Sequence, residues 1–343
     1  MFIVKSKKAI LKLGVFRMNN KWLTKKERYT LVKLNSNFTN IDKIKKEILT
    51  KDYKEHLSYI EFDPNNSKSY FEYKWVDIEN KRQQELNSGI TIYYVKATAD
   101  YEYSRKRRND SEGNLLPKDQ RVNTNDVEVI FAEYNSEVYG IIFSNDDMEL
   151  QRVRKLIGES NVTFLDDKFK VTPKFFGWLF YEHMKDKIID DNKKIINIKG
   201  FSGNIVNDTN KFTGKSKSAS NLLLTKTILA NNYPLTSIDL ELNTGLESDK
   251  VYTCAYIYQS TDDELRIIVQ RGSETNLLFV SDDLVNVMPF YMFFDLIPNM
   301  HNAYLDDEDN YENNEKPSFL KQLGIEEIKQ TMQRNHISVD DLK

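Results

Sequence analysis

Four consecutive cations follow a predicted strand and are the residues of this sequence most suited to binding a polyanion. They are Arg105, Lys106, Arg107 and Arg108. The strand, residues 90–103, places Tyr93, Tyr101 and Tyr103 on one face. Phosphate neutralisation needs cations and base stacking needs aromatic rings, so this combination predicts contact with nucleic acid. The competing interpretation is a solvated loop beyond a strand whose tyrosines pack.

The start of the chain is also basic. Residues 1–60 hold 15 Lys and Arg against 5 Asp and Glu, whereas the remaining residues hold 34 against 47. Such a segment presents a basic face to phosphates or docks on the acidic part of the same chain. The candidate phosphate-binding cations of this segment are Lys7, Lys8, Lys12, Lys25, Lys26 and Arg28. A weaker candidate patch consists of the loop lysines Lys211, Lys215 and Lys217.

The carboxylates offer one enzymatic hypothesis. Asp63 closes a predicted strand, and Glu72 and Lys74 point to the same face of the next one. Two acids that hold Mg²⁺ beside a lysine are what metal-assisted phosphodiester hydrolysis requires, and the spacing resembles the Asp…Glu-x-Lys pattern of restriction-type nucleases. The alternative is a strand with one solvent-exposed face and a cross-strand ion pair.

Other catalytic signatures are absent from the sequence. The segment 212–218 (FTGKSKS) ends like a phosphate loop, but Thr209 stands where its first glycine is required. The four histidines, at 56, 183, 301 and 336, show no zinc-ligand spacing. A serine or cysteine nucleophile with a distant histidine stays open, although no GxSxG elbow supports it, and His183 is interpreted as a satisfied core residue. We therefore expect no cofactor or metal, apart from Mg²⁺ in the nuclease alternative.

Composition predicts a reduced, globular, cytoplasmic protein. Apolar residues make up 40% and charged residues 29% of the 343 positions. Cys254 is the single cysteine, so no intrachain disulfide forms and a buried thiol is expected. Lysines interrupt the N-terminal apolar residues, which argues against a signal peptide. The apolar run 284–300 contains Pro289, Asp295 and Pro298 and is predicted to be core and not a membrane span.

Hydrophobic periodicity, caps and turn residues predict the elements. In the first half, strands are expected at 2–16, 27–35, 58–63, 69–78 and 90–103, helices at 40–49, 80–87 and 146–156, and a hairpin at 127–143 that turns at Asn135-Ser136. In the second half, helices are expected at 174–190 and 221–230, strands at 195–200, 236–243, 251–259 and 264–272, and polar loops at 104–125 and 202–219.

These elements predict an α+β protein of two mixed domains, each a largely antiparallel sheet with packed helices. The expected units are a basic N-terminal domain at 1–160, a C-terminal domain at 161–304, an extended acidic linker at 305–317 and a helical tail at 318–343.

Residues 129–158 (VIFAEYNSEVYGIIFSNDDMELQRVRKLIG) resemble a stretch of the Rex A type phage-exclusion proteins. In both, an apolar strand, an acidic and Gly-containing hairpin and an Asp-led helix that ends in Ile-Gly occur in that order. The resemblance implies a dimeric, DNA-binding bacterial defence protein that signals to a partner. It transfers no functional residue.

The expected function is that of a non-catalytic, bacterial nucleic-acid-binding protein in phage defence or mobile-element biology. The first alternative is the Mg²⁺-dependent nuclease that uses Asp63, Glu72 and Lys74. The second is a protein-interaction scaffold in a defence complex, with a protein partner or a second copy of the chain bound through its charged regions.

Overall fold

The computed structural model describes most of the chain. The described residues are 21–22, 25–63, 65–86, 88–189, 193–205, 210–244, 252–261, 263–271, 273–275 and 284–342. The predicted strand at 2–16 and the candidate cations Lys7, Lys8 and Lys12 lie outside these ranges. Only the backbone of Cys254 is described, so the predicted burial of its thiol also falls outside the description.

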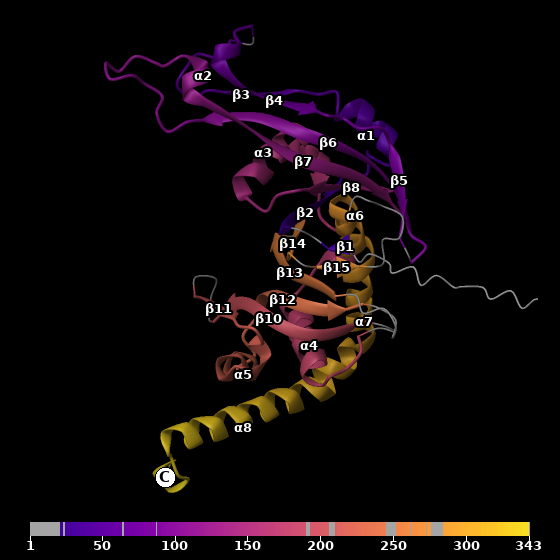
Figure 1. Ribbon diagram of the computed structural model, residues 1–343, viewed down its shortest axis with the longest axis vertical. Helices are drawn as coiled ribbons and strands as arrows, with labels where there is room; N and C mark the ends of the chain where they lie inside the picture. The colour runs from indigo at the N-terminus through magenta and orange to yellow at the C-terminus, as the bar shows by residue number, and fades with distance from the viewer. Residues whose placement is uncertain are drawn as a thin grey trace, which may run out of the picture.

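The predicted α+β class is confirmed. A 13-stranded antiparallel sheet has the order β11-β10-β12-β13-β14-β2-β8-β7-β6-β4-β3, with β5 paired to β6 and β9 paired to β2 (Figure 1). Its strands are β2 (Glu27–Leu34), β3 (Tyr53–His56), β4 (Tyr70–Val76), β5 (Arg82–Glu85), β6 (Thr91–Ser104), β7 (Val122–Tyr134), β8 (Glu137–Ile142), β9 (Val162–Thr163), β10 (Lys194–Asn204), β11 (Lys211–Lys215), β12 (Leu235–Asn243), β13 (Tyr252–Thr261) and β14 (Glu264–Val269). A separate pair joins β1 (Lys21–Trp22) to β15 (Glu274–Thr275).

Helices cover both faces of this sheet. They are α1 (Ile41–Glu47), α2 (Lys118–Arg121), α3 (Asp147–Ile157), α4 (Pro173–Met184), α5 (Leu223–Ala230), α6 (Leu284–Tyr291), α7 (Ile297–Asn310) and α8 (Lys316–Asn335). Two π-helical segments, Met292–Leu296 and Tyr311–Glu315, join α6 to α7 and α7 to α8. The resulting long helical segment runs beside the sheet from its N-terminal half to the C-terminal end (Figure 1).

The two halves of the chain share the sheet. In the centre, β2 pairs with β14 on one side and with β8 on the other, and Leu31 lies opposite Leu265 and Ile141. One core cluster lies wholly within residues 32–157, whereas the other draws residues from 29–323. The predicted boundary near residue 160 therefore falls between α3 and α4 but does not interrupt the sheet.

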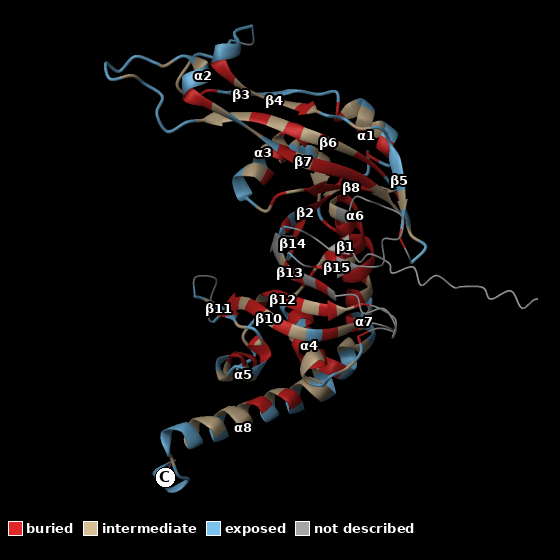
Figure 2. Ribbon diagram, viewed as in Figure 1, coloured by how far each residue is buried: buried red, intermediate tan, exposed pale blue. Residues whose placement is uncertain are grey.

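Both faces of β7 are buried, which explains its nearly continuous apolar sequence. Val129 and Phe131 pack with the core under α1 and α3, and Ile130 and Ala132 pack with the core that contains α6. Figure 2 shows the resulting buried zone along the centre of the molecule. The hairpin turn at Asn135-Ser136 is confirmed and has positive φ at both residues.

Several predicted elements are wrong. Residues 58–63 form a loop and not a strand, because Asp63 accepts a backbone hydrogen bond from Asn65 and closes a turn. The helix expected at 80–87 is the strand β5, since β6 extends beyond β4 and offers an edge for pairing. The polar loop 202–219 contains β11, which pairs with β10.

The acidic segment 306–315, expected to be extended, is helical. Its carboxylates accept hydrogen bonds from aromatic side chains of α4. The indole nitrogen of Trp178 donates to Asp307 at 3.0 Å, and the hydroxyl of Tyr181 donates to Glu315 at 2.8 Å. These partners offset the mutual repulsion on which the prediction of an extended linker relied.

The apolar run from residue 284 is core, as predicted. It forms α6 and the following π-helical segment, in which Met288, Phe290, Phe293 and Leu296 are buried. No helix in the described ranges is both long enough and apolar enough to cross a membrane.

A buried histidine in α7 predicts a specific pH dependence. His301 packs against Phe175 and Tyr304, and burial lowers the pKa of its imidazole below 6.5 against the opposing effect of Asp167 and Glu308. The unfolded chain then takes up a proton at higher pH than the folded one, so the free energy of unfolding falls as the pH drops below about 6.5. We expect His301→Phe to remove up to about 1 kcal/mol of this loss per pH unit. Urea unfolding at pH 7.5 and 5.5 measures it, and equal losses in both proteins would contradict it.

Candidate nucleic-acid interface

The basic loop between β6 and β7 projects from one end of the sheet. We name residues 105–117 the basic loop; α2 connects it to β7 (Figure 1). The loop is anchored at its base, where the backbone N–H of Arg105 donates to the carbonyl of Arg121. Near its tip, Asp110 accepts backbone hydrogen bonds from Glu112 and Asn114, which form a tight local turn. The loop therefore has a defined local structure.

All four predicted cations of this loop are exposed, and Figure 2 shows the projecting loop as largely pale blue. Their hydrogen bonds go to neutral groups: Arg105 donates to Asn123 at 2.7 Å, Arg107 to the carbonyl of Asn109 at 3.3 Å, and Arg108 to the hydroxyl of Ser104 at 3.0 Å. Within the described part of the chain, none of the four forms an ion pair with a carboxylate. Their positive charge is thus left for an external anion.

A second loop, residues 57–69, lies beside the basic loop because Arg121 joins them. Arg121 is only 2% exposed, and its guanidinium donates to the carbonyl of Leu116, the hydroxyl of Tyr59 and the carbonyl of Lys68, at 3.0, 2.9 and 2.7 Å. The guanidinium of Arg108 also lies over the Tyr59 ring, 4.8 Å from its centroid. The two loops consequently present one surface.

The second loop adds an exposed ring to this surface. Phe62 is 44% exposed and contacts His56 edge-on with ring centroids 5.6 Å apart. The Nε2 atom of His56 lies 2.6 Å from the carbonyl of Ile60, which ties the histidine to the same loop. An exposed ring on a loop that adjoins cations with no acidic partner among the described residues offers both base stacking and phosphate neutralisation. Tyr59 and Phe62 were not predicted as part of this surface because 58–63 was expected to be a strand, and Arg121 was not predicted because it lies in the expected polar loop 104–125.

The tyrosines predicted to accompany the cations do not join this surface. Tyr101 is buried, and Arg152 of α3 lies over the rings of Tyr101 and Tyr103 at 5.3 and 4.8 Å. Tyr93 is exposed near the other end of β6, beneath Lys81. Tyr101 and Tyr103 thus pack against the protein itself, as the competing interpretation required, whereas Tyr93 is exposed.

The other candidate cations that the structure describes lie on other elements than the basic loop. Lys25 pairs with Glu27 at 3.4 Å, and Arg28 is exposed on β2. Burial raises the pKa of Asp239, and the positive charges of Lys199, Lys215 and Lys26 lower it in part. Lys215 and the exposed Lys217 lie at the far end of the sheet, on and just after the edge strand β11. The chain's own acids therefore partly neutralise this second patch.

The three residues of the nuclease hypothesis interact with neighbouring residues of the sheet or of their own loop. Lys74 forms a cross-strand ion pair with Asp100 at 3.6 Å, and the backbone N–H of Glu72 donates to Glu102. Asp63 closes the turn described above. The ranges that the structure describes contain no group of three or more His, Cys, Asp or Glu side chains that could hold a metal ion. The arrangement matches the cross-strand pair of the alternative interpretation, and the hypothesis of Mg²⁺-dependent cleavage stays a prediction.

One serine and one histidine lie within hydrogen-bonding distance of each other, as a serine nucleophile would require. His183 Nε2 lies 3.1 Å from the hydroxyl of Ser220, and its Nδ1 lies 3.2 Å from the carbonyl of Ile195. Ser220 is buried, so this pair ties α4 to the segment before α5, consistent with the predicted satisfied histidine.

A search with protein-family models finds no match for this chain, and a comparison with curated proteins also finds none.

Proposed function

We propose that this protein binds nucleic acid without catalysis, through the surface formed by the basic loop and the loop 57–69. Cations supply affinity for the phosphates, and Phe62 supplies a ring on which an unpaired base stacks. In this proposal the protein works in the bacterial cytoplasm, in phage defence or mobile-element biology. That context rests on the resemblance of residues 129–158 to the Rex A type phage-exclusion proteins, which would also imply a dimer.

The observation that carries the proposal is the charge of Arg105, Lys106, Arg107 and Arg108, four adjacent cations with no acidic partner among the described residues. Several other cations do have acidic partners: Arg154 contacts Asp263 at 2.6 Å, Lys155 contacts Glu55 at 2.7 Å, and Lys226 contacts Glu326 at 2.7 Å. A protein that only needs solubility does not require four adjacent cations without acidic partners, whereas a polyanion site does.

Salt-dependent binding tests the proposal directly. We expect the purified protein to carry nucleic acid, seen as a raised absorbance ratio that falls after washing at high salt. Stripped protein should bind fluorescein-labelled oligonucleotides, with the logarithm of the affinity falling linearly with the logarithm of the salt concentration. Single-stranded DNA, duplex DNA and RNA of equal length are compared by fluorescence polarisation.

Two outcomes would count against the proposal. One is the absence of binding at about 50 mM salt, where phosphate contacts are strongest. The other is co-purification of a protein partner with no nucleic acid, which would favour the interaction-scaffold alternative.

A further inference from the structure

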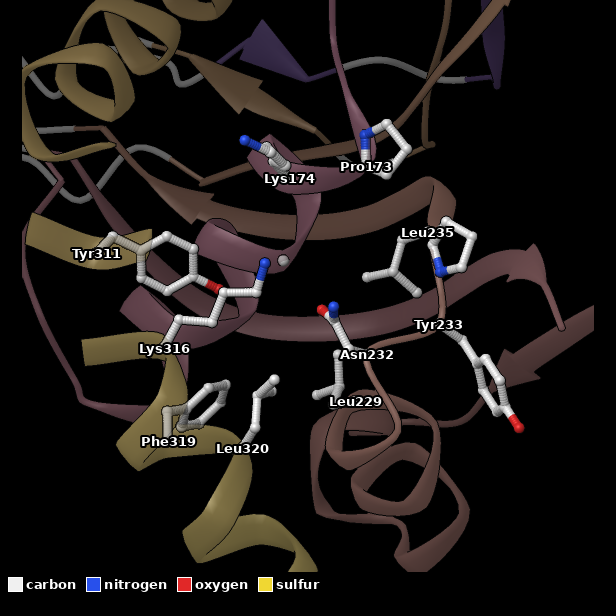
Figure 3. A pocket seen from close by; sticks show the side chains of 12 residues that line it. Pro173, Lys174, Leu229, Asn232, Tyr233, Leu235, Tyr311, Lys316, Phe319 and Leu320 are labelled. Atoms are coloured by element: carbon white, nitrogen blue, oxygen red, sulfur yellow. The ribbon is translucent and has the colours of Figure 1, made fainter. Parts of the chain in front are cut away.

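A cavity of about 200 Å³ lies far from the basic loop, in the C-terminal half of the molecule. It opens to solvent and is lined by the start of α4, the end of α5 with the segment that follows it, and the region where the π-helical segment Tyr311–Glu315 passes into α8 (Figure 3). An apolar cavity of about 150 Å³ accommodates one benzene ring, so this space suits a ligand of roughly that size.

The base of the cavity is apolar and its rim is polar. Leu229, Leu235 and Phe319 are buried residues of the lining, whereas Lys174 and Asn232 are exposed. Apolar walls with a few convergent polar groups are typical of small-molecule sites. The lining thus favours an amphipathic ligand whose apolar part enters first.

The rim of the cavity carries two cationic side chains. Lys174 and Lys316 contribute ammonium groups, and the lining residues include no carboxylate. Lys316 already pairs with Glu312 at 3.0 Å and Lys174 with Glu308 at 3.8 Å. Because an ammonium group has three N–H donors, each lysine still has donors for a ligand. The polar end of the ligand is therefore expected to be anionic.

Tyr311 adds a hydroxyl donor to the lining. Its side chain is 1% exposed and lines the cavity, yet its hydroxyl makes no hydrogen bond with any residue that the structure describes. Burial, with Glu312 nearby, raises the pKa of Tyr311 well above its usual range, so the hydroxyl stays protonated and can donate.

Gly177 makes room for the ligand. It lies in the middle of α4, where glycine weakens a helix relative to alanine. A Cβ at this position would lie 3.5 Å from the hydroxyl oxygen of Tyr311, an ordinary contact that the fold can accept. The glycine lines the cavity, so a methyl group there would occupy part of the space.

We propose that this cavity binds a small organic carboxylate with an apolar body about the size of one ring, held by Lys174, Lys316 and the Tyr311 hydroxyl. The proposal is independent of nucleic-acid binding, because it uses none of the residues of the basic loop.

Isothermal titration of the full chain with benzoate, benzamide and inorganic phosphate tests the ligand class. We expect benzoate to bind at least about tenfold more tightly than benzamide, because a hydrogen bond to a charged group is stronger than one to a neutral group. Inorganic phosphate lacks the apolar body and should not bind measurably. Equal affinity for benzoate and benzamide, or no binding of benzoate at millimolar concentration, would overturn the assignment.

Gly177→Ala gives a test in which stability and binding change in opposite directions. We expect its Tm to rise by about 1–2 °C through helix propensity, while benzoate affinity falls about tenfold because the methyl group fills the space. The matched control is Gly324→Ala in α8, where the nearest atom to the new Cβ is the Cβ of Ala230 at 3.9 Å. It should also raise the Tm but leave benzoate affinity unchanged.

Tyr311→Phe removes the donor with little change of volume and should weaken benzoate binding about tenfold while benzamide binding changes less. Unaltered benzoate affinity in both Gly177→Ala and Tyr311→Phe would place the ligand elsewhere and refute the proposal.

Discussion

Replacing Arg105, Lys106 and Arg107 together with alanine is expected to weaken nucleic-acid binding roughly 100-fold at about 0.1 M salt. The three side chains are exposed and have no acidic partner among the described residues, so their loss removes phosphate contacts without exposing a buried charge. The slope of log affinity against log salt should fall by up to about 0.9 for each contact with duplex DNA. Arg108 is kept, because its guanidinium packs on Tyr59 and supports the loop.

The matched control is the triple variant in which Lys321, Lys329 and Arg334 of α8 become alanine. These residues are also exposed, and their replacement changes the net charge by the same amount. If affinity depended only on total charge, both triple variants would lose binding equally, and the basic loop would no longer be the interface.

Replacing Arg121 with alanine is expected to lower the free energy of unfolding by about 3 kcal/mol. The arginine is buried, and its removal leaves the carbonyls of Leu116 and Lys68 without their donor and opens a cavity beside Tyr59. Because these bonds hold the two loops together, nucleic-acid affinity should fall as well. Urea unfolding and fluorescence polarisation measure the two effects separately.

Arg107→Ala, in the same loop, is the comparison for Arg121→Ala. The side chain is exposed, so its replacement should change the free energy of unfolding by no more than about 0.5 kcal/mol. A stable Arg121→Ala protein that still binds nucleic acid normally would show that the two loops need no buried link.

Local signals in the sequence predicted many of the individual elements. The strands β2 and β4 and the helices α1 and α3 depend on neighbouring residues, and all four are present in the structure, where Asn40 caps α1 and Asp146 caps α3. The same is true of Gly158, whose φ of 94° ends α3.

Elements decided by distant partners were missed. The acidic segment 306–315 is helical because Trp178 and Tyr181 donate hydrogen bonds to its carboxylates. No pattern within the segment indicates these partners. The candidate interface has the same limit. Arg105 to Arg108 were predicted as exposed cations, but the proximity of Tyr59 follows from the pairing of β4 with β6. Sequence periodicity gives no information on that pairing.

The central position of β2 has a consequence for how the chain folds. One partner of this strand, β8, leaves the ribosome early, whereas the other, β14, is made only from residue 264 onward. Until then, the apolar strand with Tyr29 and Leu31 has one edge without its hydrogen-bonding partner, and closing so long a loop is slow. During synthesis the nascent protein therefore passes through a stage with an open sheet edge, at which it is most prone to aggregate with other chains or to need a chaperone.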